Sequence, residues 1–87
     1  MDIPRQRKGR ILSGDSAGWY ILVKDDPLDT GGIYIHTSKD ISFDTGFDEW
    51  AENEAALVSI FRASGWTVIN SLDLSERFNI EWLDQNM

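Results

Sequence analysis

The sequence predicts one small α+β domain, in which a mainly antiparallel sheet of three to four strands is packed by one central helix. A chain of 87 residues has the size of a single domain. Residues 19–23 and 33–37 are rich in β-branched and aromatic side chains and flank a loop with Pro27 and two glycines, which is typical of an antiparallel strand pair. Residues 54–64 are rich in helix formers.

Each strand is predicted from its own pattern. Residues 19–23 carry apolar side chains in both alternating sets, which indicates a central strand. Residues 8–13 can form a short strand before a turn cluster, and residues 38–46 a turn or a short edge strand. Residues 66–69 follow the helix as a β-branched run, so we expect them to return to the sheet.

The helix has a clear beginning and end. Asn53 is a suitable N-cap and Gly65 a suitable terminator, while Leu57, Ile60 and Phe61 lie on one stripe.

The C-terminal region is compatible with two structures. Leu74, Phe78 and Trp82 recur every four residues, which favours a second helix over residues 73–83. Residues 78–82 also alternate in polarity as a strand does, but the spacing of the large side chains favours the helix.

The charge is unevenly distributed. Residues 1–8 are predicted to form a basic flexible arm, and residues 9–87 the domain. From Ile11 onward the chain has four basic and fourteen acidic residues, which gives this part a net charge of −10. Such a surface repels phosphate backbones and attracts basic proteins, which argues against direct binding of nucleic acid. The absence of cysteine favours the cytoplasm, and no apolar run is long enough to predict a membrane span.

The residues offer little for catalysis. His36 is the only histidine and there is no cysteine, so a zinc site or a Cys-His pair cannot be assembled, and an enzyme would depend on His36. Residues 25–31 resemble a calcium loop only in their acidity, because the ligand spacing is wrong. We therefore expect a binding protein that is not an enzyme and has no metal or cofactor.

The candidate binding residues are acids gathered in two segments, together with one aromatic residue. The candidates are Asp25, Asp26 and Asp29 in the loop between the strands, and Asp44, Asp48, Glu49, Trp50 and Glu52 before the helix. Phe47 lies within the second segment. Clustered acids steer a basic partner and aromatic residues supply buried contacts, so this set predicts a protein-binding face. In the alternative interpretation, the acids are a solvated helix start and Phe47 and Trp50 are core residues.

Four segments in order resemble small bacterial immunity proteins, the antidotes to polymorphic and contact-dependent growth inhibition toxins. The segments are GWYILVKDD (18–26), DTGGIYI (29–35), GFDEWAENE (46–54) and SGW (64–66). The resemblance implies a non-enzymatic domain that neutralises a cognate toxin, often a nuclease, by occluding its active or substrate-binding surface. The alternative is an acidic adaptor or regulatory module unrelated to toxins. Neither hypothesis defines an oligomeric state.

Overall fold

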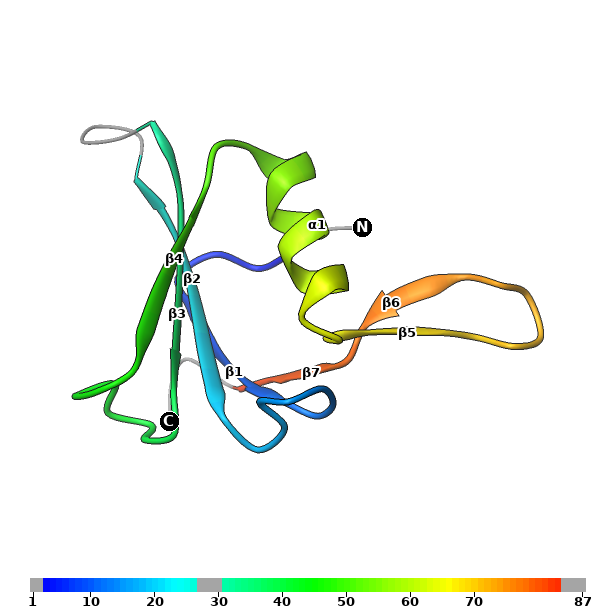
Figure 1. The fold of residues 1–87 in the computed structure, drawn as a ribbon, viewed down its shortest axis with the longest axis horizontal. Helices are drawn as coiled ribbons and strands as arrows, with labels where there is room; N and C mark the ends of the chain where they lie inside the picture. The colour runs from blue at the N-terminus through cyan, green and yellow to red at the C-terminus, as the bar shows by residue number, and fades with distance from the viewer. Residues whose placement is uncertain (1–2, 27–30, 84–87) are drawn as a thin grey trace.

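The computed structural model describes residues 3–26 and 31–83, except for the side chain of Asp26. These residues form two layers, a five-stranded sheet and one helix, from which a two-stranded hairpin projects (Figure 1). The strands are β1 (Arg7–Ile11), β2 (Tyr20–Asp26), β3 (Gly32–Ser38), β4 (Phe47–Ala51), β5 (Thr67–Ile69), β6 (Glu76–Phe78) and β7 (Ile80–Trp82), and the helix is α1 (Glu54–Ala63).

The main sheet has the order β4-β3-β2-β1-β7, and every neighbouring pair is antiparallel. The α+β class and the antiparallel pairing are therefore confirmed, and β2 occupies the predicted central position. The predicted count of three to four strands is wrong, because β7 adds a fifth strand at the edge next to β1.

Helix α1 covers one face of this sheet. Asn53 caps it as predicted, since its side chain accepts a hydrogen bond from the N–H of Ala56 at 2.9 Å. Gly65 follows the C-cap Ser64 with a φ of +77°, a conformation that favours glycine. The inner stripe of the helix packs on alternate residues of the strands. The core residues are Ile3, Ile11, Ile21, Val23, Ile33, Ile35, Ala51, Leu57, Phe61, Trp66 and Ile80.

The second helix predicted over residues 73–83 does not exist in the structure. Residues 71–73 form a turn instead, because the side chains of Asn70 and Asp73 accept hydrogen bonds from the backbone N–H groups of Leu72 and Ser75. Beyond the turns, the ring of Phe78 packs edge-on against Phe61 with centroids 5.2 Å apart. The chain continues as β7, so the strand that the alternating pattern of residues 78–82 indicates is the structure that forms, and the helix predicted from the four-residue spacing is not.

Strand β5 also differs from expectation. It does not return to the main sheet but pairs with β6, and the resulting hairpin extends away from the body (Figure 1). Asn79 fastens the base of the hairpin to the body, since its N–H donates to Trp66 O at 2.7 Å and its carbonyl accepts from Leu12 N–H at 3.1 Å. The strand partner of residues 67–69 is therefore the segment Glu76–Phe78, which follows them closely along the chain.

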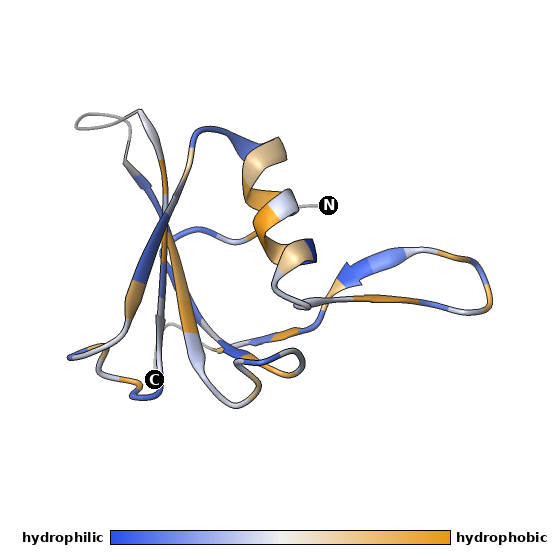
Figure 2. Cartoon of the chain, viewed as in Figure 1, coloured by the Kyte–Doolittle hydropathy of each residue, from blue (hydrophilic) through white to orange (hydrophobic). Residues whose placement is uncertain are grey.

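Residues 3–8, which the sequence analysis assigned to a flexible arm, lie against the body. Ile3 is only 4% exposed, the N–H of Gln6 donates to Val23 O at 2.7 Å, and Arg7 begins β1. Figure 2 shows the hydropathy of the chain, with apolar segments where the strands and α1 face each other. None of the helical segments in the described ranges has the length and apolar character needed to cross a bilayer.

Candidate functional site

The predicted acidic cluster lies along one edge of the sheet. We call this surface the β4 edge and define it as strand β4 with Asp44 before it and Glu52 after it. Between residues 40 and 54 the chain carries six acids and no Lys or Arg. Because β4 is the outermost strand, with β3 on one side only, these acids lie at the border of the sheet.

The pairing register divides the β4 edge between two faces. Glu49 lies opposite the buried Ile35, so Glu49 and Phe47 are on the face that α1 covers. Asp48 lies opposite His36, so Asp48 and Trp50 are on the other face. The edge therefore presents acid and aromatic side chains on both faces of the sheet.

Asp48 and His36 form a polar pair on the face away from the helix. The Nδ1 atom of His36 is 2.5 Å from Oδ1 of Asp48, and the imidazole stacks on Tyr34 with centroids 5.9 Å apart. Both residues line a hollow of about 270 Å³ together with Asp44 and Phe43. Among the described residues no group of three or more His, Asp or Glu side chains is arranged to hold a metal ion.

The two aromatic residues of β4 are not part of the core. Phe47 is 66% exposed and Trp50 is 45% exposed, so the alternative interpretation that made both of them core residues is wrong. They are nevertheless supported from one side. Phe47 stacks on Trp19 with centroids 5.9 Å apart, and the indole of Trp50 lies over Gly32, where a side chain would occupy its space. Exposed but supported aromatic rings are typical of protein-binding surfaces.

A groove of about 300 Å³ lies beside Phe47 and Glu49, on the helix face of the β4 edge. We call it the helix-edge groove. Trp66 forms part of it, and its indole N–H is buried with no acceptor among the described residues. A buried donor without a partner costs about 1–3 kcal/mol. The groove is lined by Asp15, Ser16, Ile35, Thr37, Phe47, Glu49, Ala63, Ser64 and Trp66.

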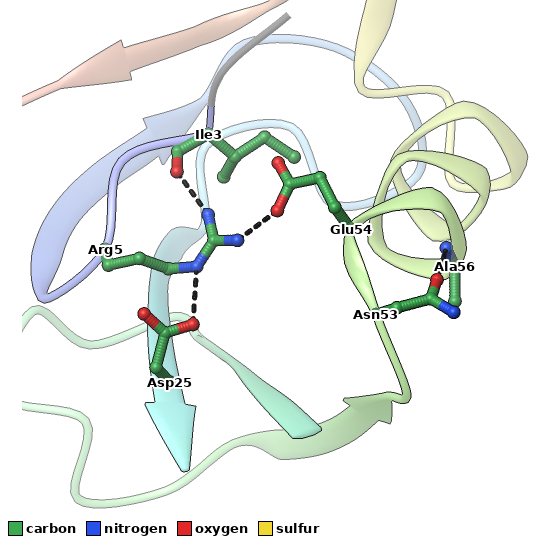
Figure 3. A network of polar contacts seen from close by, with 6 residues as sticks. All are labelled: Ile3, Arg5, Asp25, Asn53, Glu54 and Ala56. Carbon is green, nitrogen blue, oxygen red and sulfur yellow. Dashed lines mark hydrogen bonds and ion pairs between the residues drawn. The ribbon is translucent and has the colours of Figure 1, made fainter. Parts of the chain in front are cut away.

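Asp25 has a different environment from the acids of the β4 edge. Its carboxylate accepts a hydrogen bond from Nε of Arg5 at 2.9 Å, and the same guanidinium pairs with Glu54 and bonds to the carbonyl of Ile3 (Figure 3). Partial burial acts to lower the pKa of Arg5, but the hydrogen bonds to Glu54 and Asp25 outweigh it and raise that pKa. This network joins the N-terminal segment to β2 and to the start of α1.

The other loop acids are only partly within the described residues. Asp26 ends β2, but its side chain, like the whole of Asp29, lies outside what the structure describes. By register, Asp25 lies in the same row across the sheet as Ile33 and Ala51. The sheet therefore places Asp25 at the end of the β4 edge that carries Glu52.

A second exposed surface, which the sequence did not predict, lies at the tip of the β5-β6 hairpin. Ile69, Leu72 and Leu74 are exposed there, Leu72 to 93%. Leu74 was attributed to the apolar stripe of a helix together with Phe78 and Trp82, and Ile69 to a strand of the main sheet. The signal that could have located the tip is the pair of turn-forming residues Asn70 and Asp73. Asp15 and Trp66 of the helix-edge groove were also missed, because they lie in segments far apart in the sequence that only the fold brings together.

No protein-family model, curated protein or solved structure matches the chain. The β4 edge carries the chemistry that bears on function. Glu49 and Glu52 have no cation within ion-pair distance among the described residues, and the exposed rings of Phe47 and Trp50 lie beside them. This arrangement can attract and then contact a basic protein surface.

Proposed function

We propose that the chain is an immunity protein that binds a cognate toxin domain and neutralises it by covering its active or substrate-binding surface. The observation that carries the proposal is the β4 edge, where exposed acids surround two supported aromatic rings. This stretch of the chain has acidic side chains and no Lys or Arg. A nuclease toxin has a basic cleft for its phosphate substrate, and an acidic edge is complementary to such a cleft. The resemblance of residues 18–69 to immunity proteins supports the same function.

The proposed mechanism is binding without catalysis. The acids steer the encounter, and Phe47 and Trp50 supply apolar contacts once water is excluded. The protein would need no cofactor for this, and it would act in the cytoplasm, where a toxin that enters or is made in the cell has to be neutralised. The lack of cysteine suits that compartment.

The test is binding to the product of the adjacent gene, measured with purified proteins. We expect the wild-type chain to bind it and to block its activity. The double substitution Asp48→Lys and Glu49→Lys should slow association and raise Kd about 10-fold to 100-fold, because it inverts the charge at the centre of the edge. The defect should shrink at high salt, since screening weakens steering between exposed charges.

Two matched controls separate the edge from other surfaces. Glu81→Lys makes the same type of charge change on β7, the opposite edge of the sheet, and should leave Kd nearly unchanged. Leu72→Asp with Leu74→Asp changes the hairpin tip and should also leave binding intact. If the tip variants abolish binding and the β4 variants do not, the interface is on the hairpin and the proposed face is wrong.

The second candidate function is an acidic adaptor that binds a basic host protein. The acid-rich β4 edge serves this function equally well, so the discriminating result is the identity of the partner. Binding and inhibition of the adjacent gene product favours the immunity function. If the adjacent gene product is not toxic, or is not bound, the adaptor function replaces the immunity function.

A further inference from the structure

The helix-edge groove combines an apolar floor with carboxylates. Ile35, Phe47 and Trp66 form apolar or aromatic walls, while Asp15 and Glu49 add two acidic side chains, both exposed. None of the lining residues, all of which belong to the described part of the chain, is basic. An occupant with a positive charge and an apolar stem would complement both parts of the groove.

The C-terminal end of α1 strengthens the negative field of the groove. Ala63 and Ser64 line it, and the carbonyl end of a helix carries partial negative charge. The nearest cation on the helix is Arg62, but its guanidinium is held by Glu76, with Nε at 2.8 Å and a second nitrogen at 2.6 Å from Oε1. Because Arg62 is engaged with the hairpin, it is not available to neutralise the groove.

Trp66 provides an independent sign of a missing partner. Its side chain is 5% exposed, it lines the groove, and its indole N–H has no acceptor within the described residues. Buried N–H groups in folded proteins nearly always have an acceptor. This N–H is itself shut off from solvent, so an acceptor in the groove reaches it only when the indole turns toward the groove. The backbone carbonyl of a bound residue would then accept from it.

We propose that the helix-edge groove receives an arginine side chain from the protein partner. The guanidinium faces the carboxylates of Asp15 and Glu49, and its planar group and aliphatic stem lie on Phe47. Arginine fits better than lysine because it stacks on aromatic rings and bonds carboxylates through two nitrogens at once. The assignment of this arginine to a toxin rests on the proposed function, but the affinity of the groove for arginine does not.

The test uses the whole 87-residue chain and a small probe, N-acetyl-arginine N-methylamide, in an NMR titration of the ¹⁵N-labelled protein. We expect millimolar binding that moves the indole N–H resonance of Trp66 and the amide of Glu49. The citrulline analogue has nearly the same shape and the same backbone carbonyls, but a neutral urea replaces the guanidinium, and it should bind about tenfold more weakly. Equal shifts with both probes, or no shift of Trp66 and Glu49, would overturn the proposal.

Two variants locate the site. Glu49→Gln should weaken binding of the arginine probe several-fold, whereas Glu81→Gln on the opposite edge should not; equal effects would mean that only the overall charge is sensed. The failures are distinguishable. If the arginine probe binds but the adjacent gene product does not, the groove proposal stands and the immunity function falls. If the gene product binds and the probe does not enter the groove, the immunity function stands and the groove proposal falls.

Discussion

The β4 edge and the tip of the β5-β6 hairpin both expose large apolar side chains, but they are held in place by different means. All five residues of β4 pair with β3, and its aromatic rings rest on Trp19 and Gly32, which are distant in sequence. The tip is held by its own turns, with the N–H groups of Leu72 and Ser75 bonded to Asn70 and Asp73. The order of the edge therefore depends on the whole fold, and that of the tip is local.

The largest expected effect is at the start of β4. Gly46 has a φ of +144°, and a Cβ placed there would overlap the carbonyl oxygen of Thr37. Gly46→Ala should lower the free energy of unfolding by about 2–4 kcal/mol, since backbone strain and a backbone clash add together. Urea denaturation measures the change.

Gly18→Ala is the matched control for this substitution. Gly18 has a φ of +91° but no heavy atom within 4 Å of the added Cβ, so only the strain of about 1 kcal/mol is expected. If both substitutions cost the same, β4 tolerates displacement at its start, and the order of the β4 edge does not depend on the close contact with Thr37.

A smaller effect of opposite sign is expected at the tip. Leu74 has a φ of +59°, which is unfavourable for a leucine, and its side chain is exposed. Leu74→Gly should therefore raise stability by about 0.5–1 kcal/mol, the strain relief exceeding the added chain entropy. Leu72→Gly, at a residue outside the positive-φ region, should lower it by a similar amount. Hydrogen exchange of the hairpin amides reads both changes, and a loss of protection in Leu74→Gly would contradict the local origin of the order.

The smallest effect concerns the pair that ties the hairpin to the helix. The hydrogen bond from Arg62 holds the pKa of Glu76 below its ordinary value. A carboxyl group with a lowered pKa in the folded state contributes stability above its unfolded pKa, and the contribution is lost as the pH falls below about 4.3. Glu76→Gln should therefore lose less stability than the wild type between neutral and acidic pH.

The urea midpoints of both proteins at pH 7 and pH 3 check this prediction. Glu81→Gln removes an exposed carboxylate outside the hairpin and controls for the change in net charge. The same acid sensitivity in Glu76→Gln as in the wild type would show that the Arg62 pair does not contribute to stability.

The elements that the sequence predicted correctly are those with local signals. Asn53 and Gly65 bound α1 at both ends, because capping depends on a few neighbouring residues. The β2-β3 pair was predicted from two apolar runs and the loop between them. Of the candidate site, the sequence located the acids from Asp44 to Glu52, since a cluster in sequence is also a cluster along one strand.

The sequence by itself determined the class of the fold, the helix, the central strand pair and the charge of the protein. Only the tertiary structure decided the form of residues 73–83, because the spacing of Leu74, Phe78 and Trp82 suits a helix while Phe78 packs on Phe61 and Ile80 pairs with Ile11 of β1. It also decided that Phe47 and Trp50 are exposed. Exposure depends on the position of β4 in the sheet, and strand order is a long-range property that no local pattern contains.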